Sequence, residues 1–333
     1  MRKKWLWAIP VILITIYLLG PAPVKPVYRT EMPAVPADPV QLETYIKNNE
    51  AAHKIKPDNE ARVSWYNDSA KQKTEYSIVY LHGFSASQAE GDPVHRNLAK
   101  KFGCNLFLSR LAEHGIDTTD AMINLTADEY WESAKQALAI GKQIGHKVIL
   151  LATSTGGTNA LQLAAVYPDD VAALILMSPN IAINNSNAWL LNNHWGLQIA
   201  HLILGSDYVT TKDNRPIYKQ YWNWQYRAEA AAALEEMLET TMTKETFEKV
   251  KQPVQLLYFY KDEQHQDSVV KVSAMLKMFD ELGTADSLKR KKAMPNAGTH
   301  VLGSYIKSHD VEGVQKEIEK FMTEVLKMKE VSR

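Results

Sequence analysis

Ser154 lies where a run of residues typical of a buried strand meets a run of small residues typical of a tight turn. The strand pattern ends at Ala152, and a helical pattern over Gly157–Val166 follows directly. A nucleophilic serine must protrude from a sharp strand-to-helix turn, so the residues two positions before and after it must be small. Ala152, in place of the more usual glycine, and Gly156 meet this requirement. The pattern predicts a serine nucleophile for acyl transfer, and the alternative is an ordinary serine-rich turn that caps a helix.

A second candidate turn, His82-Gly83-Phe84, follows a predicted strand over Ser77–Leu81. Negative charge that develops on a substrate oxygen is best stabilised by fixed backbone N–H groups. We expect the N–H groups of Phe84 and Thr155 to serve as these donors, because they come from this turn and from the residue after the predicted nucleophile. The side chain of His82 is interpreted as a structural hydrogen-bonding group and not as a catalytic base.

A catalytic base must come from a loop that lets an imidazole reach the serine oxygen. His300 comes just after the small, flexible pair Ala297-Gly298 and precedes a terminal helix predicted to start near His309. Among the 10 histidines of the chain, His300 is therefore the predicted base. His309 is the nearest rival, and we interpret it as a solvent-facing residue at the start of that helix.

The elements that must position these residues alternate between short β-rich runs and helical patterns such as Thr126–Ile144. This order predicts an α/β fold with a mostly parallel sheet and helices on both faces. From about Ile181 to Val250 the alternation stops, which indicates an inserted cap; its aromatic run Ile217–Tyr226 is expected either to line a pocket or only to pack. The predicted strands are Arg62–Trp65, Ser77–Leu81, Asn105–Ser109, Lys147–Ala152, Ala172–Met177 and Val254–Tyr260.

A third strand end, over Leu108–Gly115, reads L-S-R-L-A-E-H-G. Together and in this order, the three motifs resemble the α/β-hydrolase superfamily, especially its serine carboxylesterase, lipase and monoglyceride-lipase-like branch. That branch usually reads R-L-x-G-H-G in the third motif, and Glu113 departs from it. The resemblance covers roughly residues 60 to 325. It implies an α/β-hydrolase fold with a mostly parallel eight-stranded sheet, a helical cap between strands six and seven, and a Ser, acid, His triad in that chain order.

The resemblance places the triad acid on the loop after the seventh strand, where two aspartates compete. Asp262 lies at the right distance behind the strand Val254–Tyr260, whereas Asp267 begins a D-S-V-V run that matches the family's D-x-V-V before its helix. We prefer Asp267 and keep Asp262 as the alternative. The acid would fix the tautomer of His300 and stabilise its imidazolium form.

Composition excludes several other classes of function. Lys plus Arg and Asp plus Glu both number 38, so no net charge would draw the chain to nucleic acid. The single cysteine, Cys104, can form neither an intramolecular disulfide nor a thiolate metal cluster. No glycine-rich phosphate loop or metal-ligand cluster is visible, so we expect no cofactor and no metal.

The N-terminus has the pattern of an export or membrane signal, because Arg2–Lys4 precede the uncharged run Trp5–Gly20. Signal peptidases tolerate proline badly just after the cut, and Pro23 follows the small residue Ala22. We therefore expect an uncleaved anchor that leaves the catalytic domain membrane-bound on the periplasmic or extracellular side. The alternative is an exported soluble protein after signal cleavage, since the apolar run is short for a span of about 20 residues.

The chain accordingly divides into an anchor or signal segment over residues 1–24, a proline-rich spacer and lead-in over 25–60, and a hydrolase domain over 61–330. The cap insertion occupies about 181–250. The function we expect is cleavage of carboxylic esters, small or lipid-like, through Ser154, His300 and Asp267 and an acyl-enzyme intermediate. Thioester and amide hydrolysis use the same triad and stay open. The competing hypothesis is a catalytically silent, membrane-anchored binding module, because this fold also hosts non-enzymes.

Overall fold

A mostly parallel sheet of seven strands forms the centre of the computed structural model, which describes residues 2–331. The strand order is β1-β3-β2-β4-β5-β8-β9, and only β1 runs antiparallel to its neighbour. Because parallel strands share one carboxyl edge, the loops that leave β2, β4 and β8 meet at that edge. The strands are β1 (Arg62–Ser64), β2 (Thr74–Leu81), β3 (Asn105–Leu108), β4 (Gly145–Thr153), β5 (Val171–Met177), β8 (Val254–Tyr258) and β9 (Lys289–Ala293).

The expected count of eight strands is wrong for the described residues. The segment before β1 forms helix α2 (Pro39–Ala51), and the sheet has seven strands. The Asp38 carboxylate caps this helix by accepting backbone N–H groups of its first turn, and Leu42 and Ile46 bury one face in the core. Because the helix buries the apolar side chains of this segment against the core, the segment does not have to pair with the sheet to bury them.

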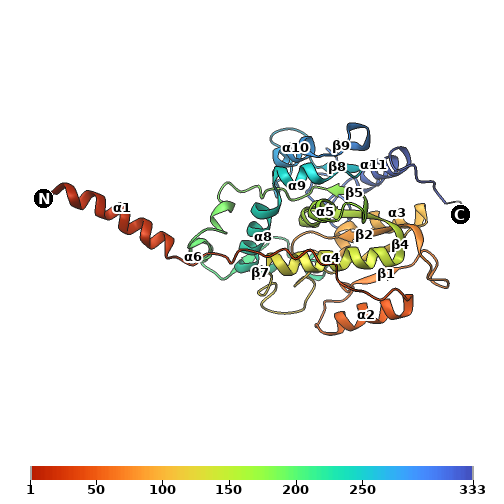
Figure 1. Ribbon diagram of the computed structural model, residues 1–333, viewed down its shortest axis with the longest axis horizontal. Coiled ribbons are helices and arrows are strands. Elements are labelled where there is room, and N and C mark those ends of the chain that lie inside the picture. Colours follow the sequence, from red (N-terminus) through yellow and green to blue (C-terminus); the bar gives the residue numbers. More distant parts are fainter. Residues whose placement is uncertain (1, 332–333) are drawn as a thin grey trace.

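Helices cover both faces of the sheet, as Figure 1 shows. The alternation of side chains along a strand supplies a core to each face. On β2, Val79 and Leu81 belong to one buried cluster, whereas Ile78 and Tyr80 belong to the other. Both clusters are nearly free of solvent, and each fully buried leucine or valine contributes roughly 1.5–3 kcal/mol.

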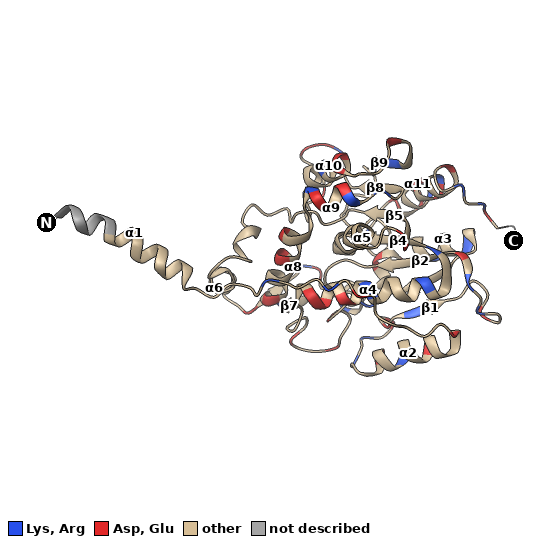
Figure 2. Cartoon of the chain, viewed as in Figure 1, with Lys and Arg blue, Asp and Glu red and all other residues tan. Residues whose placement is uncertain are grey.

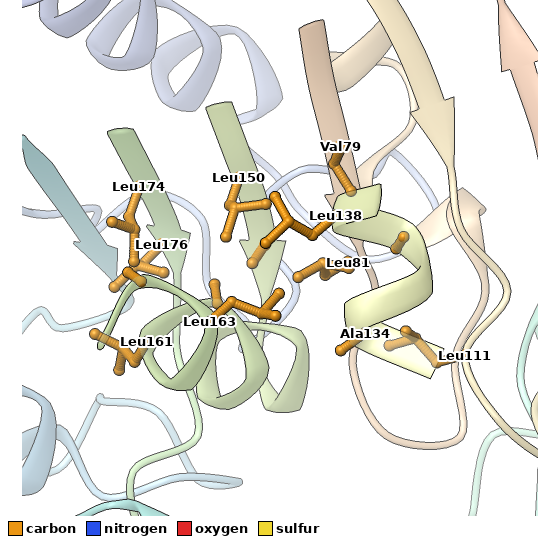
Figure 3. Close-up of a cluster of buried hydrophobic side chains, with 14 of the residues drawn as sticks. Val79, Leu81, Leu111, Ala134, Leu138, Leu150, Leu161, Leu163, Leu174 and Leu176 are labelled. Carbon is orange, nitrogen blue, oxygen red and sulfur yellow. The ribbon is translucent and has the colours of Figure 1, made fainter. Parts of the chain in front are cut away.

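The first face is covered mainly by α4 (Ala127–Ile144) and α5 (Thr155–Val166). Figure 3 shows Leu138 of α4 and Leu161 of α5 beside the leucines of the central strands. The second face is covered by α3 (Val94–Phe102) and α11 (Val311–Glu324). The sheet is thereby held rigidly under the loops at its carboxyl edge.

The segment between β5 and β8 forms a cap over that edge, in the region where the sequence predicts an insertion. It contains several helices and a small antiparallel pair of strands. The elements are the short 3-10 helix η2 (Ala188–Leu190), α6 (Gly196–Leu204), β6 (Tyr208–Thr210), α7 (Pro216–Tyr221), β7 (Gln225–Arg227), α8 (Ala228–Thr241) and α9 (Lys244–Lys249). The remaining elements are α10 (Val272–Glu281) and the 3-10 helices η1 (Gln88–Gly91) and η3 (Asp286–Leu288).

Helix α1 (Arg2–Leu18) stands out from the domain beside α6 (Figure 1). In the part of this helix whose side chains are described, residues 8–18, Figure 2 shows no charged residue. Across residues 2–331, no helix combines the length and the apolar character that crossing a membrane requires. The end of α1 contacts the cap, where the Gly20 carbonyl lies 2.6 Å from Nδ1 of His194.

The proline-rich segment after α1 lies along the domain and contacts α4. The Trp131 indole N–H donates to the Arg29 carbonyl at 2.7 Å, and the Lys135 ammonium donates to the Glu31 carbonyl at 2.9 Å. Prolines prevent this segment from forming a helix, but its carbonyl groups stay available as acceptors for side chains of α4.

Candidate active site

Ser154 occupies a sharp turn between β4 and α5. Its φ of 52° and ψ of −121° lie outside the regions that most residues adopt, and such a conformation costs of the order of 1–3 kcal/mol. The Ser154 N–H donates to the Met177 carbonyl at 3.0 Å, which ties the turn to β5. Gly156 is required here because a Cβ atom would collide with the Leu81 carbonyl oxygen. The small residues of the motif therefore allow the turn to pack directly on β2.

Asp267 and His300 form a hydrogen-bonded pair at the same edge of the sheet. Nδ1 of His300 lies 2.6 Å from Oδ2 of Asp267. The other carboxylate oxygen, Oδ1, accepts the N–H groups of Val269 and Val270 at 2.9 and 3.1 Å. The D-x-V-V run thus fixes the carboxylate, and the carboxylate fixes the orientation of the imidazole.

The electrostatics of this pair favour a charged histidine. Burial alone would lower the pKa of His300, but the adjacent Asp267 carboxylate outweighs burial and holds that pKa above its ordinary value. Burial likewise opposes ionisation of Asp267, yet the charge of His300 and the hydrogen bonds lower the pKa of the carboxyl group. A protonated His300 beside an ionised Asp267 is therefore a stabilised state of the site.

Asp262, the alternative acid, makes a separate pair with His265. Nδ1 of His265 lies 2.8 Å from Oδ1 of Asp262, and both side chains are exposed. The same carboxylate accepts the N–H groups of Gln264 and His265, which closes a short surface loop. Of the two aspartates, Asp267 is the one in contact with His300.

The turn that follows β2 packs against Ser154. A Cβ atom on Gly83 would lie 2.8 Å from Cβ of Ser154, so only glycine permits this approach. Phe84 comes next in this turn, and Thr155 is the first residue of α5, whose N–H has no carbonyl partner within the helix. His82 is buried, with Nε2 accepting the Leu111 N–H at 3.1 Å, and burial lowers its pKa to about 4. This arrangement agrees with a structural role for His82.

A cavity of about 620 Å³ lies between these residues and the cap. Ser154, Phe84 and His300 line its floor, and mainly aliphatic side chains of the cap line its walls. Tyr218, Trp222 and Tyr226 of the predicted aromatic run also line it. The aliphatic residues from α6 and α8 are Ile199, Ala200, Ile203, Leu204, Ala228, Ala231 and Leu234.

Glu90 is a site residue that the sequence analysis missed. It lies in η1, is 2% exposed and lines the same cavity. Burial raises the pKa of its carboxyl group to about 7, although the Gly83 N–H and the charge of His300 act against this shift. One signal was present, because Glu90 is the only Asp, Glu, Lys or Arg between Ser77 and Gly91. Within residues 2–331, no group of three or more His, Cys, Asp or Glu side chains could hold a metal ion.

Solved structures with the same architecture include several lipolytic enzymes. A structure of LipS and LipT, two metagenome-derived lipolytic enzymes, superposes with a TM-score of 0.65 at 16% identity, over 81% of this chain and 99% of that one. The Paleococcus ferrophilus monoacylglycerol lipase gives 0.58 at 13% identity, over 80% and 99% of the two chains. Est1E from Butyrivibrio proteoclasticus with bound ferulic acid gives 0.56 at 17% identity, over 80% and 95%. At these identities the similarity shows the α/β-hydrolase fold alone.

No curated protein matches the chain in sequence. The family described as Hydrolase_4, serine aminopeptidase S33, matches residues 73–298, which include the turns after β2 and β4 and the segment that carries Asp267. This match spans more than half of the chain. The chain therefore belongs to the Hydrolase_4 (S33) family of the α/β-hydrolase superfamily.

Proposed function

We propose that the protein is a serine hydrolase that cleaves carboxylic esters, with Ser154 as nucleophile, His300 as base and Asp267 as the acid of the triad. One observation carries the proposal: His300, whose Nδ1 lies 2.6 Å from Oδ2 of Asp267, lines the same cavity as Ser154. A serine in a strained turn, a buried and oriented histidine and an apolar cavity together meet the requirements for acyl transfer.

In the proposed reaction, His300 takes the proton of the Ser154 hydroxyl while the serine oxygen attacks the ester carbonyl carbon. Negative charge then forms on the carbonyl oxygen, where the N–H groups of Phe84 and Thr155 would stabilise it. His300 returns the proton to the departing alcohol, which leaves an acyl group on Ser154. Water, activated by His300, attacks the acyl-enzyme and releases the acid. Asp267 stabilises the imidazolium that forms in each half of the reaction.

The aliphatic side chains of the cavity walls favour binding of esters that have an apolar acyl or alcohol part. Burying each methylene of such a chain contributes about 0.8 kcal/mol, and the aliphatic side chains of α6 and α8 supply the surface. Ile203 lines the cavity and is also 76% exposed, so the apolar surface continues from the cavity to the outside of the cap. This continuity favours lipid-like esters over strongly polar ones.

The proposed location is outside the cytoplasm, with the N-terminal segment holding the domain at the membrane. The supporting observation is the sequence pattern of Arg2–Lys4 before an uncharged run. Signal cleavage, which would release the domain, is the competing outcome.

The proposed activity is tested with a fluorophosphonate probe and a series of p-nitrophenyl esters from acetate to palmitate. The wild-type protein should be labelled and should hydrolyse the esters, and Ser154→Ala should lose labelling while its thermal unfolding stays close to that of the wild type. Turnover should fall by several orders of magnitude, about 10⁶-fold in a well-studied serine protease. Labelling that persists in Ser154→Ala would reject this nucleophile.

Matched thioester and p-nitroanilide substrates identify the bond that is cleaved. Faster hydrolysis of either class would move the protein to the thioester or amide hydrolases. A wild-type protein that accepts neither the probe nor any substrate would favour the catalytically silent binding module.

A further inference from the structure

Glu90 is a buried carboxylate that the proposed reaction does not use. It lies in η1 and lines the cavity together with Ser154 and His300. A buried acid is costly unless hydrogen bonds compensate it, so its contacts indicate why it is there.

The carboxylate contacts the turn that follows β2. The Gly83 N–H donates to Oε2 of Glu90 at 2.5 Å. The position of a Cβ atom on Gly83 lies 2.9 Å from the same oxygen and 2.8 Å from Cβ of Ser154. Gly83 is therefore held between the carboxylate and the proposed nucleophile.

The segment that carries Glu90 is itself fixed by packing. The Gln88 carbonyl lies 2.9 Å from Nε2 of the buried His95. Gly91 lies so close to the ring of Tyr80 that no side chain would fit between them. Glu90 thus presents its carboxylate from a rigid support and not from a mobile loop.

The other end of the turn is held by the cap. The Asn223 N–H donates to the Ser85 carbonyl at 2.7 Å, and the ring of Phe84 packs edge-on against Tyr226. The Glu90 contact fixes the His82–Gly83 peptide, one peptide before the one that joins Gly83 to Phe84. The carbonyl of that next peptide accepts the Ala86 N–H at 3.2 Å and lies 2.9 Å from Nδ1 of His82. Because glycine has no side chain to restrict its φ and ψ, these contacts together with the Glu90 hydrogen bond must set the orientation of the Gly83–Phe84 peptide.

We propose that Glu90 is a positioning residue whose carboxylate oxygen, by accepting the Gly83 N–H, holds the turn after β2 so that the Phe84 N–H of the next peptide faces the oxyanion. This inference rests on the proposed serine-hydrolase function. The role requires a side-chain oxygen within hydrogen-bond distance of the Gly83 N–H, and it does not require a negative charge. Glu90 interacts electrostatically with four titratable side chains, His300, Tyr80, Tyr130 and Tyr218. Of these four, His300 is the one that changes charge near neutral pH.

The matched pair Glu90→Gln and Glu90→Asp separates reach from charge. Gln keeps an acceptor oxygen at the same distance and removes the charge, whereas Asp keeps the charge and withdraws the oxygen. We expect kcat on p-nitrophenyl butyrate to fall less than about tenfold in Glu90→Gln and about 10²-fold or more in Glu90→Asp, as after loss of an oxyanion donor. KM should change little in either variant. Exposed Glu324→Asp is the control for the substitution itself.

A trifluoromethyl ketone, which forms a tetrahedral adduct with a serine, supplies a readout that a purely structural role would not move. Its affinity should fall in Glu90→Asp by the same factor as kcat/KM, while thermal unfolding of both variants is measured in parallel. The opposite ranking, with Asp active and Gln impaired, would assign the effect to charge and overturn the proposal. Wild-type kinetics and inhibitor affinity in both variants would overturn it as well. If the wild-type protein itself neither hydrolyses esters nor binds the ketone, the proposed function has failed and the inference with it.

Discussion

Nδ1 of His300 lies 2.6 Å from Oδ2 of Asp267, a residue 33 positions earlier in the chain. The contact joins the loop after β8 to the loop before α11, across the carboxyl edge of the sheet. It leaves Nε2 as the ring nitrogen that can serve Ser154, because Nδ1 is committed to the carboxylate. The relationship defines which carboxylate can act on the proposed base.

Asp267→Asn is expected to lower kcat by about 10⁴-fold, because an amide in this position favours the wrong tautomer of His300. Asp262→Asn, the control, is expected to stay within a few-fold of the wild type, since Asp262 contacts His265 at the surface. Steady-state kinetics on one p-nitrophenyl ester measures both. The reverse ranking would assign the acid to Asp262.

The acid limb of the pH profile follows from the raised pKa of His300. Protonated His300 cannot accept the serine proton, so kcat/KM should be low at acid pH and rise through a midpoint above the ordinary value of 6.5. Glu90→Gln should move this midpoint to lower pH, because the charge of Glu90 contributes to the raised pKa. A midpoint below 6.5 in the wild-type protein would contradict the arrangement.

The same pair makes stability depend on pH in a defined direction. The raised pKa of His300 contributes stability that is fully present below the pKa of the unfolded chain and is lost as pH rises through the folded pKa. The lowered pKa of Asp267 contributes stability that is present above its unfolded value and is lost as pH falls through the folded pKa. The free energies of unfolding of the wild type and Asp267→Asn should therefore differ most at pH values between the ordinary pKa of an aspartate and the ordinary pKa of a histidine. Chemical unfolding of both proteins as a function of pH measures this difference.

Much of this candidate site could be predicted from the sequence because its residues lie in motifs with local geometric requirements. The predicted strand over Lys147–Ala152 is β4, and the predicted helix over Gly157–Val166 is the main part of α5. These elements were predictable because a buried parallel strand, and the tight turn that joins it to the next helix, both restrict residue type strongly. The choice between Asp262 and Asp267 could not be made from spacing, because it depends on how the loop after β8 closes.

Other features depend on contacts between distant segments. β9 was not predicted because it reads K-R-K-K-A and lies at the edge of the sheet, where charged residues are tolerated. Glu90 was missed because an isolated charged residue does not by itself indicate a role, and only the contact with Gly83 shows what Glu90 supports. The docking of the proline-rich segment on α4 likewise has no periodic signal in the sequence.

Filling the cavity should change the acyl-chain preference. Ala231 on α8 lines the cavity, and Ala231→Phe should lower kcat/KM for long-chain esters by about tenfold or more while sparing acetate. Ala233→Phe is the matched control, because Ala233 lies on the same helix and lines a separate pocket beside Pro21–Pro26. An unchanged chain-length profile in Ala231→Phe would show that substrate does not occupy this part of the cavity.

Removing the proline-rich segment should lower stability in a graded way. A chain that starts at Val27 keeps the acceptors for Trp131 and Lys135, whereas a chain that starts at Ala37 loses both and still keeps the Asp38 cap of α2. Each lost hydrogen bond costs about 0.5–1.5 kcal/mol, and more where a buried donor stays unsatisfied. Calorimetry should show a Tm several degrees lower for the shorter chain and a nearly unchanged Tm for the longer one. Equal Tm values would show that this segment does not stabilise the domain.

The location of the protein depends on whether the N-terminal segment is retained or cleaved. Retention of Trp5–Gly20 should keep the full-length protein with membranes after an alkaline carbonate wash, while a chain that starts at Val27 should be released and active. Helix α1 has 17 residues and a length of about 25 Å, which is less than the roughly 30 Å of a bilayer core. Local thinning or flanking residues would have to supply the difference. Protease added to cells whose outer envelope has been opened, with the cytoplasmic membrane intact, should degrade the catalytic domain if it lies beyond the cytoplasm. Mature protein that begins after about residue 20 in the exported soluble fraction would establish cleavage, and full-length protein in the cytosolic fraction would contradict export.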